Sequence, residues 1–439
     1  MNTSPLARVP LSAALLFVAS AGAQDCAWEN LGPQPASVFS DPPRMVAFDD
    51  GDGLAVFIGG ELVTADSQRL AGVSRFDGER FTSVGQFDPD ALITDMGVFD
   101  LGQGPRLIVS ALVVGGGSQV FLLEGEEWLL VGPQLRGRIN ALAVLDHGAG
   151  PVLYAAGDIT FSLEGRIVRG IVQLIDDQWR GLPSVGAGGV FGQVIDMVVF
   201  DDGSGPAVYL AGDEVTVLGS GGERGVARWD GVVLSSVEGG PIGGEVRDLL
   251  VFDDGHGEAL YLGGFFDFPV IRDPLSVASW DGEQWSILGG EFENEVFTLA
   301  GFDFGLGPTL FAGSFGEFDD PRTEFIGQWN GVSWVPLPQR LNGGVSILLG
   351  VSGPGIGGLY ALGGFDFEPG RPRNGLGRVA DCELCETDLD QDGESTVFDF
   401  LAFVGLYEVG SPRADFDGDG VLTTFDLVAF GDEFDAGCP

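Results

Sequence analysis

Two acidic stretches near the C-terminal end place carboxylates at the spacing of metal ligands. Both follow one twelve-residue pattern, with aspartate at positions 1, 3, 5 and 12 and glycine at position 6, and they begin 27 residues apart at Asp388 and Asp415. Ca²⁺ takes six to eight oxygen ligands, which carboxylates at these positions supply, while the glycine permits a sharp turn. One such stretch alone is compatible with a bare acidic turn. A tandem pair, each followed by an apolar run, predicts two bound Ca²⁺ ions.

Each predicted loop combines side-chain oxygens with one backbone carbonyl group at position 7. The ligands of the first loop are Asp388, Asp390, Asp392, Glu394 through its carbonyl, Thr396 and Asp399. Those of the second loop are Asp415, Asp417, Asp419, Val421 through its carbonyl, Thr423 and Asp426.

The elements that hold these loops are two short helices. Apolar residues recur at helical spacing after each loop. They are Phe400, Phe403, Val404 and Tyr407 after the first, and Leu427, Phe430 and Phe434 after the second. We expect most of these residues to pack on each other as the core of a small domain, and surplus aromatic residues to offer a docking surface.

Residues 385–439 resemble a type I dockerin, because the tandem loops close on Asp rather than on the Glu of ordinary EF-hands. The ending Asp435-Ala-Gly-Cys-Pro439 is similar to that of GC-type dockerin-anchored bacterial exported proteins. The resemblance implies folding on Ca²⁺ and binding to a cohesin domain of a scaffold or cell surface. Val397-Phe398 and Thr424-Phe425 differ from the small polar residues that cellulosomal dockerins often carry at positions 10 and 11.

The larger part of the chain repeats one pattern about every 50 residues. A turn of the Phe-Asp-x-Gly type recurs at spacings of 46 to 55 residues, and an apolar strand and an aromatic-Asp/Asn-Gly turn follow it. The anchors are Phe48, Phe99, Leu145, Phe200, Phe252, Phe302 and Val351. Four strands per repeat of this length are typical of a kelch-like β-propeller. The predicted fold is an all-β seven-bladed β-propeller with four-stranded blades, followed by a small α-helical module of the dockerin or EF-hand kind.

The last repeat lacks its fourth strand, and the start of the chain supplies a match for it. Residues 26–32 align with residues 283–289, so Trp28 takes the place of Trp285. We therefore expect the N-terminal strand to close the last blade and leave no open sheet edge. The alternative is an open array of repeats.

Four cysteines favour disulfides over metal or redox chemistry in an exported protein. The alignment places Cys26 and Cys382 on neighbouring strands of the closing blade, which predicts the Cys26–Cys382 bridge. Cys385 and Cys438 then bracket the C-terminal region, which predicts the Cys385–Cys438 bridge. A Cys382–Cys385 bridge is the alternative.

Residues 1–23 are predicted to be a signal peptide, with Arg8, an apolar centre over residues 11–18 and the cleavage motif Ala21-Gly-Ala23. The expected domains are this signal, the propeller over 24–382 and the module over 383–439, in a protein secreted or held at the cell surface. We expect no membrane-spanning segment in the mature chain. With 65 acidic residues, 21 basic ones and a net charge of −44, nucleic acid is excluded as a partner.

Residues for catalysis are few. The two histidines, His147 and His256, both lie in turns. Ligand sites are expected among the long connections on one face, which are Glu61–Leu70, Asp158–Arg169, Asp213–Arg224, Phe265–Leu275, Gly316–Phe325 and Phe365–Asn374. The sequence favours a non-catalytic binding or display module with a glycan or protein ligand on that face. The alternatives are a carbohydrate-active enzyme with catalytic acids in these loops, and a purely structural surface protein.

Overall fold

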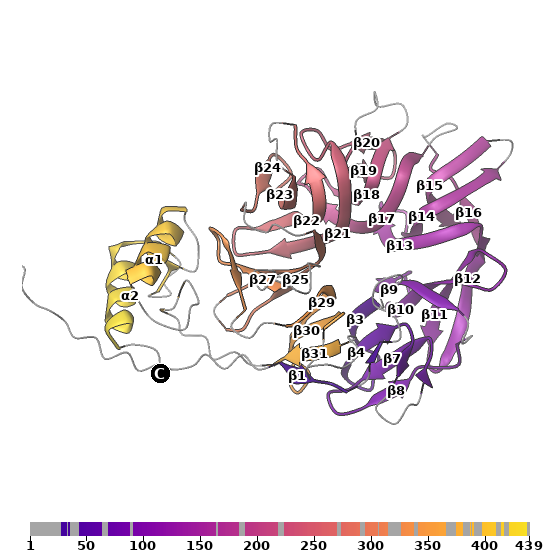
Figure 1. Cartoon of the computed structure of the whole chain (residues 1–439). Helices are drawn as coiled ribbons and strands as arrows, with labels where there is room; N and C mark the ends of the chain where they lie inside the picture. The colour runs from indigo at the N-terminus through magenta and orange to yellow at the C-terminus, as the bar shows by residue number, and fades with distance from the viewer. Residues whose placement is uncertain are drawn as a thin grey trace, which may run out of the picture.

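The structure is a computed structural model in which a ring of β-sheets lies beside a pair of helices (Figure 1). It describes residues 28–32, 34–35, 44–63, 69–87, 91–163, 166–183, 189–217, 224–269, 274–289, 295–305, 307–314, 326–337, 341–365, 375–380, 387, 389, 397–409, 414–416 and 421–436. The predicted signal peptide and all four cysteines lie outside this set, so both disulfides stay predictions. Among the described residues, no helix is long and apolar enough to cross a bilayer.

Most strands belong to four-stranded antiparallel units. Within the described residues there are seven such units, and units 4 and 5 are joined into one sheet at Asp213 and Glu245. Units 1 to 4 are β3 (Arg44–Asp49), β4 (Leu54–Gly59), β7 (Val73–Phe76) and β8 (Phe81–Ser83); β9 (Leu92–Asp100), β10 (Pro105–Leu112), β11 (Ser118–Glu124) and β12 (Glu127–Leu135); β13 (Gly137–Asp146), β14 (Pro151–Leu163), β15 (Arg166–Ile175) and β16 (Gln178–Arg180); and β17 (Val190–Asp201), β18 (Pro206–Val217), β19 (Ala227–Trp229) and β20 (Leu234–Ser236). Units 5 to 7 are β21 (Gly243–Asp253), β22 (Glu258–Asp267), β23 (Leu275–Trp280) and β24 (Trp285–Ile287); β25 (Val296–Phe302), β26 (Thr309–Ser314), β27 (Ile326–Trp329) and β28 (Trp334–Pro336); and β29 (Val345–Val351), β30 (Gly358–Gly363), β31 (Gly375–Val379) and β1 (Glu29–Asn30). A small separate sheet contains β2 (Gln34–Pro35), β5 (Leu62–Val63) and β6 (Arg69–Leu70).

The turn after each of the first six anchors is fixed by its aspartate. Oδ1 of Asp49 accepts hydrogen bonds from the backbone N–H groups of Gly51 and Gly53, at 2.9 and 3.3 Å. Both glycines have φ near +100°, a conformation that other residues adopt only with strain. The same pair of bonds recurs at Asp100, Asp146, Asp201, Asp253 and Asp303. Turn geometry therefore explains these repeated aspartates.

The ring is closed by both ends of its sequence, as the repeat alignment predicts. In unit 7, β1 pairs with β31 through Glu29 opposite Arg378 and Asn30 opposite Gly377. Each inner strand contacts the inner strands of both neighbours, including β29 with β3. One buried cluster joins Val56 and Ile58 of unit 1 to Leu362 of unit 7. The alternative of an open array is therefore wrong.

A tryptophan on the fourth strand ties each of four units to the preceding one. The indole Nε1 of Trp334 donates a 2.8 Å hydrogen bond to the carbonyl oxygen of Leu288 in unit 5. The same bond recurs from Trp128 to Val84, from Trp179 to Pro133 and from Trp285 to Glu238. Trp28 of the closing strand is 8% exposed and lies in the cluster that joins units 6 and 7. Its aligned position with Trp285 is thus matched by its packing.

The C-terminal helices are α1 (Val397–Val409) and α2 (Thr424–Ala436). Their core forms around Phe403 and Phe430, whose rings stack with centroids 4.5 Å apart. Phe400 and Leu427, which the periodicity assigns to the same faces, are 40% and 41% exposed. The apolar stripe of each helix is wider than its contact with the other described residues. Part of the expected core is therefore a surface.

Candidate functional site

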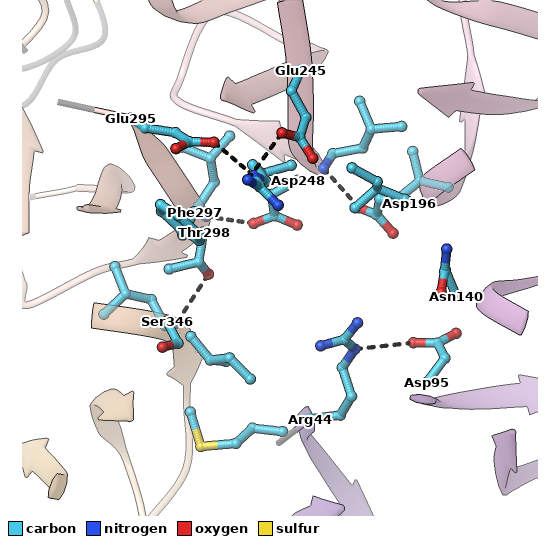
Figure 2. A pocket seen from close by; sticks show the side chains of 18 of the residues that line it. Arg44, Asp95, Asn140, Asp196, Glu245, Asp248, Glu295, Phe297, Thr298 and Ser346 are labelled. Atoms are coloured by element: carbon cyan, nitrogen blue, oxygen red, sulfur yellow. Dashed lines mark hydrogen bonds and ion pairs between the residues drawn. The ribbon is translucent and has the colours of Figure 1, made fainter. Parts of the chain in front are cut away.

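A cavity of about 750 Å³ lies on the axis of the ring, lined by the inner strands of all seven units (Figure 2). The residues that line it are Arg44, Met45, Asp95, Arg138, Asn140, Gln193, Ile195, Asp196, Val198, Glu245, Arg247, Asp248, Leu249, Glu295, Phe297, Thr298, Leu299, Ser346, Ile347 and Leu348. Most of them lie on the first halves of the inner strands. The starts of these strands pair with the ends of the second strands, as Gly243 does with Asp267. The long connections leave from those ends. The cavity is therefore at the long-connection face.

The described parts of these connections are more regular than the sequence suggests. Thr160 to Leu163 and Arg166 to Arg169 continue the hairpin of β14 and β15, so this connection is largely strand. Leu62–Val63 and Arg69–Leu70 likewise pair with each other. The sequence marks these segments as loops because they interrupt the repeat. Extra hairpin pairs satisfy their backbone hydrogen bonds locally.

At the rim of the cavity, one guanidinium group is held between two carboxylates. Arg247 Nη2 lies 2.9 Å from Glu245 Oε2, and Arg247 Nε lies 2.7 Å from Glu295 Oε1. Figure 2 shows the side chains of Glu245, from β21, and Glu295, which immediately precedes β25, directed toward the same part of the cavity. The guanidinium carbon lies 4.8 Å from the ring centroid of Phe297, a cation–π contact. Burial raises the pKa of Glu245, against the charge of Arg247.

Deeper in the cavity, three aspartates bond to the backbone of the following unit. Asp95 Oδ2 accepts a 2.7 Å hydrogen bond from the N–H of Leu142, and Asp196 Oδ2 accepts one of the same length from Leu249. Asp248 accepts from the N–H of Leu299 in the same way. The hydrogen bonds of these aspartates therefore join neighbouring units.

Their ionisation is costly in this position. Burial raises the pKa of Asp95 to about 6, although Arg44 Nε lies 3.8 Å from its Oδ1 atom and opposes the shift. Burial also raises the pKa values of Asp196 and Asp248. The proximity of Asp196 raises the pKa of Asp248 further. Both carboxyl groups therefore release their protons at a higher pH than isolated aspartates do.

On the opposite face, the charged residues form ion pairs and hydrogen bonds that stabilise turns. Arg228 lies 3.0 Å from Asp202 and donates to the hydroxyl oxygen of Tyr209, which itself donates to Asp202 at 2.6 Å. Arg75 forms the equivalent 2.8 Å pair with Asp50. His147 contacts Tyr154, and His256 contacts Asp254 in its own turn. Neither histidine lines the central cavity.

The predicted Ca²⁺ ligands are described only in part. Asp399, Asp415, Val421, Thr423 and Asp426 are described, and Asp388, Asp390, Asp392, Glu394, Thr396, Asp417 and Asp419 lie outside the described residues. Asp399 and Asp426 are fully buried in the first turns of α1 and α2. Asp426 Oδ2 accepts a 2.6 Å hydrogen bond from the N–H of Thr423, so positions 9 and 12 of the second loop meet. Among the residues that the structure describes, no three His, Cys, Asp or Glu side chains are grouped to hold a metal.

Sequence reasoning missed the cavity residues. Arg44, Asp95, Asp196 and Asp248 each stand four residues before an anchor phenylalanine. Thr298 holds the same position before Phe302, and its hydroxyl oxygen accepts from the N–H of Leu348 at 3.0 Å. A polar residue at this point of an otherwise apolar inner strand was the available signal.

No protein-family model matches the chain, and no curated protein matches its sequence. Solved structures with similar folds include a chain of the mitotic checkpoint complex, at 14% identity and a TM-score of 0.44, covering 87% of this chain and 97% of that one. BBS1N in complex with ARL6DN has 12% identity and a TM-score of 0.39, covering 80% of this chain and 97% of its own. A mutant of the Aleuria aurantia lectin with alpha-methyl-L-fucoside has 9% identity and a TM-score of 0.35, again covering 80% and 97%. The propeller-like architecture rests on the strand pairing of this chain.

Proposed function

We propose that this chain is an exported, non-catalytic binding module in which a seven-bladed propeller presents the axial cavity to a ligand. The observation that carries the proposal is the cavity itself, to which all seven inner strands contribute side chains. Its volume of about 750 Å³ falls within the range of about 300–1,000 Å³ that is usual for ligand sites. The rigid strands fix the polar groups, and the connections at the rim are free to vary.

The charges of the cavity favour a basic protein segment as the ligand. Five of the lining side chains are carboxylic and three are guanidinium groups, and the whole chain has a net charge of −44. Such a surface attracts cations over a long range and orients them before contact. The side chain of Glu295 is 30% exposed at the rim, where an incoming lysine or arginine meets it first.

We further propose that residues 383–439 are a dockerin-like tether that binds two Ca²⁺ ions. The buried carboxylates of Asp399 and Asp426 and the bond from Thr423 to Asp426 fit the oxygen ligands that Ca²⁺ requires. Its partner is a cohesin-like or cell-surface protein. An exposed apolar strip on the two helices supports this role, and it consists of Phe400, Leu401, Phe425, Leu427 and Val428.

A carbohydrate-active enzyme is the second candidate, because Asp196 and Asp248 have raised pKa values inside a cavity. Glycosidases separate their two carboxyl groups by about 5–5.5 Å or about 6.5–9.5 Å to act on a sugar from two sides. Asp196 and Asp248 instead each accept a hydrogen bond from the backbone of the next unit, so their carboxyl groups already serve to join units. Turnover of a polysaccharide panel, abolished by Asp248→Asn, would establish the enzyme and overturn our proposal.

The binding proposal is tested with peptides displayed on phage and selected on the full chain. We expect enriched peptides to carry lysine or arginine, and their affinity to fall several-fold with Glu295→Gln. The matched control is Glu283→Gln, which removes the same charge from an exposed turn on the opposite face. Equal binding to both variants and to the wild type would place the ligand elsewhere and refute a site in the axial cavity.

A further inference from the structure

A second cavity, of about 470 Å³, lies within unit 2 and beside the segment that enters it from unit 1. It is lined by Gln86, Phe87, Ala91, Val113, Val114, Gln119, Phe121, Trp128 and Gln134. Val113 and Val114 belong to the turn between β10 and β11 on the long-connection face, whereas Phe121 and Trp128 lie further along β11 and β12. None of them lines the axial cavity. The second cavity is therefore independent of the proposed ligand site.

This cavity exists because unit 2 has a short second connection. Val113 to Gly117 form a tight turn, with hydrogen bonds of 3.0 Å from Val113 N–H to the Gly117 oxygen and 3.2 Å from Gly116 N–H to the Val113 oxygen. In unit 5 the corresponding connection begins with Phe268, which is buried and packs edge-on against Trp285 at 5.7 Å. Unit 2 has no residue of this kind in its turn. The space that unit 5 fills with its own chain is left open to a ligand.

Aromatic rings form one wall of the cavity. Phe87 packs edge-on against both Phe121 and Trp128, with ring centroids 5.0 and 5.5 Å apart. The indole of Trp128 is fixed by its hydrogen bond to Val84. These rings are thus held in place before any ligand arrives, which lowers the entropy lost on binding. Flat rings of this kind suit a ligand with an apolar face.

Three glutamines supply the polar groups. Within the described residues, the side-chain amides of Gln86, Gln119 and Gln134 have no hydrogen-bond partner. Each amide offers two donors and one acceptor, which together match vicinal hydroxyl groups. No described lining residue is charged, although the chain has 65 acidic residues. The described part of the lining therefore suits an uncharged ligand.

We propose that the cavity in unit 2 binds a neutral pyranose sugar. The C–H face of the ring packs on Phe87, Phe121 and Trp128, and the hydroxyl groups bond to the three amides. An apolar ligand would leave these amides unpaired, and a charged one would lose its hydration without a counter-charge. A neutral sugar can pack on the aromatic rings and also form hydrogen bonds with the glutamine amides.

The test is calorimetric titration of the full chain with the methyl glycosides of glucose, galactose, mannose and fucose, with glucuronate and glucosamine as charged counterparts. We expect at least one neutral glycoside to bind at millimolar concentration. Gln119→Ala with Gln134→Ala should weaken it roughly tenfold, because two hydrogen bonds are lost. Val114→Trp, at a side chain that is 74% exposed on the turn, should abolish binding by filling the cavity.

The matched control is Gln103→Ala, which removes a glutamine side chain from the opposite end of unit 2, in the turn after Asp100. It should leave the affinity unchanged, and Glu295→Gln at the axial cavity should do so as well. Failure of every neutral glycoside to bind would overturn the proposal. So would binding that survives Val114→Trp, or a preference for a charged sugar. None of these results bears on the proposal for the axial cavity, because that proposal is tested separately with peptides and Glu295→Gln.

Discussion

The carboxylate oxygen Oδ2 of Asp196 lies 2.7 Å from the backbone nitrogen of Leu249, a residue on the inner strand of the next unit. The same bond runs from Asp95 to Leu142 and from Asp248 to Leu299, and Thr298 makes it with a hydroxyl group. One position of the repeat thus supplies an acceptor that joins units. The aspartates of the axial cavity hold the ring together, and the rim residues are the better targets for ligand binding.

Stability is expected to fall as the pH rises above about 4. The folded protein keeps protons on Asp95, Asp196 and Asp248 at pH values where the unfolded chain has released them, because their pKa values are raised. For Asp95 the rise from 3.8 to about 6 corresponds to about 3 kcal/mol lost across that window. Thermal unfolding followed by circular dichroism against pH measures the slope.

Asp248→Asn should reduce this pH dependence. Asparagine still accepts the hydrogen bond from Leu299, but it carries no charge to bury. We expect the variant to be more stable than the wild type at about pH 7.5 and nearly equal to it at about pH 4.5. Asp100→Asn makes the same chemical change in an exposed turn and should leave the profile unaltered. A uniform loss of stability at every pH would contradict the explanation.

Trp334→Phe should destabilise the fold by about 2–4 kcal/mol, because it leaves the Leu288 carbonyl unpaired and opens a cavity. Trp334 is only 6% exposed. Trp285→Phe breaks the equivalent bond to Glu238 at a site that water reaches, so it should cost less. Chemical denaturation measures the loss of unfolding free energy in each of the two variants. Equal losses would show that packing alone matters.

Arg228→Met should cost about 2 kcal/mol, less than the 3–5 kcal/mol typical when a fully buried pair is broken. Burial tends to raise the pKa of Asp202, but bonds from Ser204 and Tyr209 and the charge of Arg228 outweigh it, and the pKa is lowered. The contribution of Asp202 is therefore present above its ordinary value of 3.8 and is lost as the pH falls below it. Denaturation at neutral and acidic pH should show the variant and the wild type converging in acid.

Removing residues 24–32 should open the ring. The edge of β31, which β1 covers through Glu29 and Asn30, would then be exposed for pairing with another chain. We expect a marked fall in melting temperature and self-association in size-exclusion chromatography. Glu29→Gln, which removes only the 2.7 Å ion pair with Arg378, should change stability by less than about 1 kcal/mol. A monomeric deletion variant with wild-type stability would refute the role of this strand.

The full chain should bind two Ca²⁺ ions, and Asp426→Ala should remove one of them. Asp426 is buried and occupies position 12 of the second loop, where a carboxylate contributes strongly to affinity. Calorimetric titration after chelation gives the number of sites. Asp281→Ala, in an exposed turn of the ring, is the control and should leave two ions bound. Absence of any Ca²⁺ binding to the wild type would remove the tether from the proposed function.

The local structure of this protein can be predicted from short stretches of its sequence. The turn at Asp49 needs only a hydrogen-bond acceptor and two glycines within four residues. Its conformation can therefore be predicted from the local sequence. The spacing between successive turns then gives the repeat length, and the match between Trp28 and Trp285 predicts the closing strand. These features depend on short-range hydrogen bonds and on side chains that repeat at fixed positions.

The positions of the candidate binding sites depend on contacts between residues that are far apart in the sequence. Asp196 and Leu249 are 53 residues apart, and they meet because packing between the sheets sets the curvature of the ring. The axial cavity is the sum of seven inner strands, so no single repeat encodes its charge or its size. The cavity of unit 2 depends on a missing aromatic residue in one turn and on Phe87 arriving from the preceding unit. Such contacts are set by how distant surfaces pack, which the order of residues along one repeat does not specify.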